Sequence, residues 1–186
     1  MTSNSTHSLL VLGGARSGKS AHAQARAEVL GGQLIYIATA QAFDEEMVDR
    51  IARHRADRDA RWTTVEEPLD LPAAIVAASR RDRVVLVDCL TLWASNLLLA
   101  EHDLTAAADA LTKAISGCQG PLILVANEVG LGIVPDNLLA RRFRDYAGSI
   151  NQSVAAVASE VVIMFAGLPM TIKPGLSPEG HRLGSA

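Results

Sequence analysis

A phosphate-binding pattern near the start of the chain carries the clearest chemistry. Residues 13–20 read GGARSGKS, which fits Gly, four residues, then Gly-Lys-Ser. They follow an apolar run and precede an alanine-rich stretch with helical periodicity, the strand–loop–helix setting of a phosphate-binding loop (P-loop). Its glycines let backbone N–H groups face one cavity, and the following helix N-terminus adds partial positive charge. We expect Lys19 to reach the β- and γ-phosphates of a nucleotide and the Ser20 hydroxyl to ligate Mg²⁺.

Two carboxylates follow other apolar runs. Asp88 ends the run VVLV, and in P-loop enzymes an acid at such a strand end holds Mg²⁺, directly or through water. The simpler interpretation is an aspartate that caps the next turn. Glu128 follows the run 122–126 in a glycine-containing loop. Because ligands bind at the carboxyl edge of a parallel sheet, the P-loop, Asp88 and Glu128 should share that edge.

An arginine-rich segment, residues 50–61, contains one histidine, His54. On a helix, His54 follows the apolar stripe of Met47 and Ile51. A solvated basic face explains most of the arginines but explains His54 less well. Neighbouring arginines lower the pKa of a histidine and keep the imidazole neutral and nucleophilic. His54 is therefore a candidate covalent nucleophile, with His22, one turn past Lys19, as the rival.

Composition limits the class of protein. The 186 residues are 49% hydrophobic and 20% charged, as expected for one soluble α/β domain with a sizeable core. The net charge of −3 argues against non-specific binding to nucleic acid. Two cysteines without metal-ligand spacing, and no apolar run long enough to span a membrane, favour a cytoplasmic protein with reduced thiols.

Short apolar runs alternate with helical patterns along the chain. Strands are expected at 9–12, 34–38, 84–87, 122–126 and 161–165, and 62–66 could be an edge strand or part of a hairpin. Helices are expected at 19–30, 43–60, 70–80, 91–100, 104–116 and 136–159. Continuous apolar strands indicate burial on both faces, as in a mostly parallel sheet covered by helices. We expect one domain over 1–186 with an ordered core of about 8–173 and mobile tails at 1–7 and 174–186.

Taken together, and in their order along the chain, several stretches closely resemble one family, the bifunctional adenosylcobinamide kinase / adenosylcobinamide-phosphate guanylyltransferases of cobalamin biosynthesis. The stretches that carry the resemblance are GGARSGKS, IATAQ, RIARHRADR, WTTVEEP, LVDCLTLWASNLL, NEVGLGIVPDNLLARRFRDYAGSINQ and AGLPMTIK. They cover almost everything from residue 9 to 173. Ala126 is a small departure, because Ser or Thr is expected there, and the tail after residue 173 lies outside the pattern.

The resemblance implies a RecA-like P-loop fold, a homo-oligomer with a trimer as one form, and two reactions. A phosphoryl group passes from ATP or GTP to adenosylcobinamide, and GMP then passes from GTP to adenosylcobinamide phosphate through a histidine that falls on His54. Mg²⁺ is the expected metal, at Ser20 and Asp88. The nucleotide-binding residues implied are Gly13, Gly14, Ala15, Arg16, Ser17, Gly18, Lys19, Ser20, Thr39, Ala40, Gln41, Arg55, Ala56, Asp57, Arg58, Glu66 and Asp88.

Two other functions compete with this interpretation. A small-molecule P-loop kinase would have no covalent step, so trapped GMP on the protein separates it from the bifunctional enzyme. The second is a RecA-like ATPase module that binds a partner or nucleic acid, and the net charge of −3 and the absence of basic, aromatic-rich loops argue against it.

Overall fold

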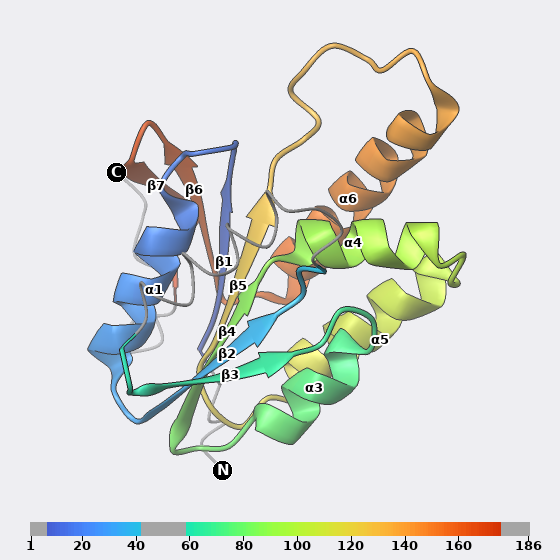
Figure 1. Ribbon diagram of the computed structural model, residues 1–186. Helices are drawn as coiled ribbons and strands as arrows, with labels where there is room; N and C mark the ends of the chain where they lie inside the picture. Colours follow the sequence, from blue (N-terminus) through green and yellow to red (C-terminus); the bar gives the residue numbers. More distant parts are fainter. Residues whose placement is uncertain (1–6, 42–58, 176–186) are drawn as a thin grey trace.

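The structure, a computed structural model, describes residues 7–41 and 59–175. Its strands are β1 (Ser8–Gly13), β2 (Gln33–Ala38), β3 (Trp62–Glu66), β4 (Arg83–Asp88), β5 (Leu122–Asn127), β6 (Glu160–Phe165) and β7 (Leu168–Lys173). Its helices are α1 (Lys19–Leu30), α3 (Leu71–Ala78), α4 (Leu90–Leu99), α5 (Leu104–Ser116) and α6 (Leu138–Val157). Figure 1 shows them as one twisted sheet between helices.

The strands form one seven-stranded sheet in the order β3-β2-β4-β5-β1-β6-β7. All neighbouring pairs from β3 to β6 are parallel, and β7 pairs antiparallel with β6. This confirms the expected mostly parallel sheet. Segment 62–66 is an edge strand that pairs in parallel with β2, so the hairpin alternative is wrong. The carboxyl ends of β1 to β5 consequently meet along one edge of the sheet.

β7 was not expected from the sequence. Its six residues LPMTIK contain a proline and show no continuous apolar run, because they form an edge strand exposed along almost its whole length. The turn that produces it is local. Ala166 and Gly167 both have positive φ, 50° and 82°, as two-residue hairpin turns require. This hairpin adds the antiparallel edge to the sheet.

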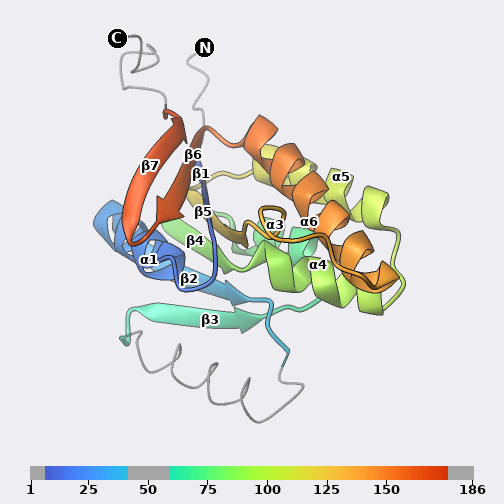
Figure 2. The ribbon, with the colours of Figure 1, turned by 90° about the horizontal axis from the view of Figure 1, so that it is seen from above.

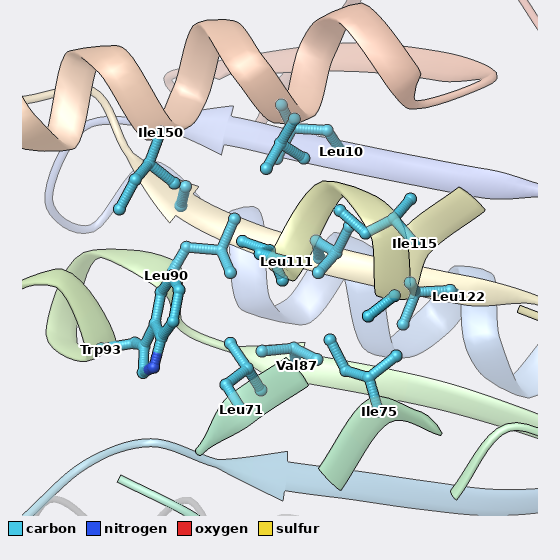
Figure 3. Packing of buried hydrophobic residues seen from close by; sticks show 14 of the residues in the cluster. Leu10, Leu71, Ile75, Val87, Leu90, Trp93, Leu111, Ile115, Leu122 and Ile150 are labelled. Carbon is cyan, nitrogen blue, oxygen red and sulfur yellow. The ribbon is translucent and has the colours of Figure 1, made fainter. Parts of the chain in front are cut away.

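Helices cover both faces of the sheet, as expected. Among the described helices, α1 lies alone on one face, and α3, α4, α5 and α6 lie on the other (Figures 1 and 2). The larger core is packed between these four helices and the sheet, and Figure 3 shows Leu71, Trp93, Leu111 and Ile150 pointing into it. On the other face, small residues of α1, Ala23 and Ala27, let the helix lie close to the strands.

The helix boundaries agree closely with those predicted from the sequence. α1 and α5 match their predicted ranges, and Asp103 caps α5 by accepting from Thr105 N–H and Ala106 N–H, both at 3.0 Å. α3 and α6 begin after their caps Asp70 and Asn137. The predicted helix 43–60 falls mostly on residues 42–58, outside the described part. Its end is wrong, because Asp59 and Ala60 are not helical. Residues 1–6 and 176–186 of the predicted tails are also outside the description.

No helix in ranges 7–41 and 59–175 is both long and apolar enough to cross a bilayer.

Candidate active site

The P-loop connects the end of β1 to the start of α1, as predicted. Gly18, which precedes the helix, has φ of 89°, a left-handed conformation that side chains with a Cβ rarely adopt. Gly13 has no room for a Cβ, because the Ser17 hydroxyl and the Met164 carbonyl lie against it. Gly167 N–H donates to Ser17 O at 3.1 Å, so the β6–β7 turn supports the loop. These contacts explain the glycines by backbone geometry.

Lys19 is the first residue of α1 and is 8% exposed. Its Nζ donates to the Gly14 carbonyl at 3.2 Å, so the ammonium group lies over the loop that it is expected to serve. The Ser17 hydroxyl is buried and has no hydrogen-bond partner among the residues described. The ammonium of Lys19, the N–H groups at the start of the helix and the Ser17 hydroxyl are all hydrogen-bond donors. Phosphate oxygens can accept from all three together. The loop therefore fits a nucleotide phosphate chain.

Asp88 lies at the same edge of the sheet. It is half-buried at the end of β4, and in the sheet it pairs with Ala38, the last residue of β2. The neighbouring Cys89 thiol reports on the charges nearby. The pKa of the Cys89 thiol is raised to about 11: burial is the largest cause and the Asp88 carboxylate also raises it, while a hydrogen bond from the Leu92 backbone and the Lys19 ammonium lower it. Asp88 and Lys19 therefore both lie near this buried thiol.

Thr39 joins the ends of β2 and β4. Its hydroxyl donates to Cys89 O at 2.7 Å and accepts from Cys89 N–H at 2.9 Å, while its own N–H donates to Asp88 O at 3.4 Å. Thr39 is fully buried. The side chain predicted to bind nucleotide thus has a structural role that fixes the backbone around Asp88.

The other residues expected at this site fall into two groups. Glu66 is exposed at the end of β3 and pairs with Ala38, and Ala40 and Gln41 follow β2, so these three lie at the predicted edge. His54 and the implied set Arg55, Ala56, Asp57 and Arg58 lie outside the described residues. The structure therefore places the P-loop, residues 39–41, Glu66 and Asp88 along one edge of the sheet, with β2, β4 and β5 between Glu66 and the P-loop.

Ser20 and Asp88 suit Mg²⁺ in the form that the ion takes in P-loop enzymes. Mg²⁺ prefers oxygen ligands and usually keeps several waters, with one or two protein oxygens and the substrate phosphates completing its shell. Ser20 is in the first turn of α1, and Asp88 ends β4 at the same edge. No group of three or more His, Cys, Asp or Glu that could hold a metal occurs among the described residues, which such a site does not need.

His22, the rival nucleophile, lies in the first turns of α1. Its backbone N–H donates to Gly18 O at 3.0 Å, and its Nε2 atom is buried without a hydrogen-bond partner among the described residues. Burial lowers the pKa of His22, Arg26 lowers it further, and Glu160 has a smaller opposing effect. His22 therefore remains the rival of His54.

Glu128 follows β5 beside the P-loop. Its N–H donates to Gly13 O at 3.1 Å, and its carboxylate accepts from Gly130 N–H at 2.8 Å, so the acid shapes its own loop. The preceding residue, Asn127, was given no role from the sequence. Its Oδ1 atom is buried without a partner in the described part, next in register to Gly13. The signal that could have identified it is a polar side chain at a strand end.

Known proteins resemble this chain over most of its length. A family model described as cobinamide kinase / cobinamide phosphate guanyltransferase matches residues 9–172. The bifunctional adenosylcobalamin biosynthesis protein CobP of Pseudomonas aeruginosa is 49% identical over 166 residues, covering 88% of this chain and 96% of its own. The Escherichia coli protein CobU, of the same description, is 42% identical over 182 residues, with 89% and 99% covered.

A solved structure from Pyrococcus horikoshii OT3 is similar in fold alone, with a TM-score of 0.55 at 10% identity over 95% of this chain and 91% of that chain. The family model, in contrast, spans residues 9–172, a range that includes every described residue of the site. With its P-loop, strand-end aspartate and sheet order, this chain belongs to the family of cobinamide kinase / cobinamide phosphate guanylyltransferases, bifunctional enzymes of adenosylcobalamin biosynthesis.

Proposed function

We propose that both reactions of this bifunctional enzyme use one nucleotide site at the P-loop, and that GMP transfer proceeds through His54. The observation that carries the proposal is the glycine loop around the buried Lys19, at the sheet edge that also holds Asp88. A single cradle for a triphosphate can serve attack at either the γ- or the α-phosphorus, depending on which nucleophile is presented.

In the kinase reaction, the hydroxyl of the aminopropanol arm of adenosylcobinamide attacks the γ-phosphorus of ATP or GTP and loses its proton to water. The bond from that phosphorus to the β–γ bridging oxygen breaks, and ADP or GDP leaves. Lys19 and the N–H groups at the start of α1 offset negative charge on the phosphate oxygens, which favours the transition state more than free substrate.

In the guanylyl reaction, a neutral imidazole nitrogen of His54 attacks the α-phosphorus of GTP, and pyrophosphate leaves. A phosphate oxygen of adenosylcobinamide phosphate then attacks the same phosphorus. The P–N bond breaks, adenosylcobinamide-GDP forms and the imidazole is restored. Arginine at positions 55 and 58 would help to neutralise the triphosphate. A phosphoramidate suits the intermediate because it remains a reactive phosphoryl donor.

Ser20 and Asp88 would hold Mg²⁺ beside the phosphates. When bound, the ion neutralises charge on the phosphate oxygens. The remaining features of the proposal come from the family resemblance: a homo-oligomer, and the adenosylated form of cobinamide as the corrinoid substrate.

The test is transfer of label from α-labelled GTP to the protein. Label should remain on the protein in base and be lost in acid, as a P–N bond requires. His54→Ala should remove the label, whereas the matched histidine variant His22→Ala should keep it. Label that persists in His54→Ala and disappears in His22→Ala would reverse the assignment. A wild-type protein that phosphorylates cobinamide without ever acquiring label would instead be a kinase with no covalent step.

A further inference from the structure

The connection between β5 and α6 exposes apolar side chains beside the nucleotide edge. Figure 1 shows it extending away from the end of β5 before the chain enters α6. Its apolar residues and those of the first helical turn are exposed by 51% to 97%: Leu131, Ile133, Val134, Leu138 and Leu139. Apolar side chains gathered on one exposed segment mark a binding surface more often than isolated ones do. The segment is therefore a candidate binding surface.

A pocket of about 560 Å³ lies between this connection and α6. Gly130, Gly132 and Val134 line it from the connection. Its volume is within the range of about 300–1,000 Å³ that small-molecule sites occupy. The occupant of the surface can therefore be a small molecule that enters the pocket.

Gly148 indicates that this space is kept open. It lies in the middle of α6, where glycine is a poor helix former compared with alanine. A Cβ added there would meet no heavy atom within 4 Å in the part of the chain that the structure describes, so packing gives no reason for a glycine. Gly148 faces the pocket. Its missing side chain enlarges the pocket at a cost to the helix.

The polar groups in the pocket suit carboxamides. Arg144, Asp145, Ser149 and Gln152 line it from α6, on one face of the helix. Arg144 Nε lies 3.7 Å from Asp145 Oδ1, so the two charges largely balance each other. Together these side chains offer both donors and acceptors with little net charge. A ligand with an apolar body and a rim of amide groups meets both the exposed apolar residues and this polar wall.

The position of the connection matches an acceptor substrate. It begins at Glu128, whose N–H donates to Gly13 at the start of the P-loop. A molecule held by the connection is thereby placed at the edge of the sheet where the triphosphate is proposed to bind. Cobinamide, the substrate of this family, has an apolar corrin ring whose periphery carries carboxamide arms.

We propose that the pocket between residues 130–134 and α6, with the exposed apolar residues beside it, binds the corrin ring of cobinamide. This inference rests on the proposed nucleotide site only for the expectation that the aminopropanol arm of cobinamide points toward the P-loop. Corrinoid binding itself can be measured without any nucleotide.

The experiment is equilibrium dialysis of cobinamide against the full chain, read by the absorbance of the corrin ring. Gly148→Leu should fill the pocket and weaken cobinamide binding about tenfold or more, while Gly148→Ala, the matched control, should bind within about threefold of wild type. Both substitutions favour the helix, so neither should lower the melting temperature. Ile133→Ser changes a side chain that is 97% exposed and should weaken binding without affecting folding.

Equal cobinamide affinity in Gly148→Leu, Ile133→Ser and wild type would overturn the proposal. So would a loss of binding that accompanies a smaller assembly in sedimentation velocity, because the surface would then be a contact between copies of the chain. If Gly148→Leu does not fold, Ile133→Ser decides alone. Labelling of the protein by α-labelled GTP should be unchanged in Gly148→Leu, Gly148→Ala and Ile133→Ser. Failure of that labelling in wild type would reject the covalent step and leave the dialysis result standing.

Discussion

The side-chain amide of Asn96 donates to the main-chain carbonyl of Thr39 at 2.8 Å and, with its second hydrogen, to the carbonyl of Pro68 at 3.0 Å. Asn96 is on α4 and is 5% exposed. Thr39 follows β2 and Pro68 follows β3, so one buried amide joins the carboxyl ends of two strands to a helix. These ends carry Thr39 and Glu66, which are proposed to contact nucleotide.

Asn96→Ala should therefore lower the free energy of unfolding by about 2–4 kcal/mol, because the buried carbonyl of Thr39 and the half-buried carbonyl of Pro68 lose their donor. Affinity for GTP should weaken as well, since the strand ends are less firmly held. Chemical denaturation and equilibrium GTP binding measure the two effects. Ser116→Ala removes an exposed hydroxyl bond on α5 and should stay within about 0.5 kcal/mol of wild type. A similarly small change in Asn96→Ala would show that water replaces the amide.

Lys19→Ala should depress both activities, because both need the triphosphate held at the P-loop. The loss of one charge-assisted phosphate contact costs about 2–4 kcal/mol of transition-state stabilisation, or roughly 30- to 1,000-fold in rate. Lys113→Ala, on the exposed face of α5, is the matched control and should retain wild-type rates. Steady-state rates of phosphoryl and guanylyl transfer measure the effect. A loss confined to one activity would mean that the two reactions do not share this cradle.

Asp88→Asn should lower activity and shift its Mg²⁺ requirement to higher concentration. The substitution keeps the shape of the side chain and removes the charge that favours the cation. The measurement is the rate of each reaction across a Mg²⁺ titration, with the exposed helical variant Asp109→Asn as control. Superimposable titrations for Asp88→Asn and wild type would leave Asp88 as the cap of a turn.

A pH-dependent contribution to stability comes from Glu160, whose two oxygens accept from Arg26 at 3.0 and 2.8 Å. The hydrogen bonds from Arg26 lower the pKa of Glu160, against an opposing effect of burial. A depressed folded-state pKa means that the stabilisation is complete above the unfolded-state pKa, about 4.3 for glutamate, and is lost as pH falls through the folded value.

Glu160→Gln should therefore lower the free energy of unfolding at pH 7 by about 1–3 kcal/mol, the range for hydrogen bonds to charged groups. The difference from wild type should shrink as the pH is lowered below 4. Denaturant unfolding at several pH values tests both parts, with the exposed variant Glu101→Gln as control. A constant difference at every pH would show that shape, rather than charge, accounts for the loss.

How far the sequence predicts this protein depends on whether a feature is local. The P-loop is formed by consecutive residues, and its glycines are required by backbone geometry at positions such as Gly18, so the pattern itself predicts the cradle. The parallel strands were predicted equally well because burial on both faces leaves a continuous apolar run. β7 was missed for the converse reason: an exposed edge strand has no face that must be apolar.

The rest of the site depends on contacts between distant residues. Asp88 could be assigned to a strand end from the sequence, but its neighbours followed from the strand order, which places β5 between β1 and β4. That order brings Asn127 beside Gly13, and α4 brings Asn96 to Thr39, across 57 positions of the chain. Gly148 is similar. The residue type shows only a poor helix former, and the tertiary structure shows that the space beside it is open. The sequence determined the local chemistry because backbone geometry depends on neighbouring residues, and the tertiary structure decided which distant groups meet.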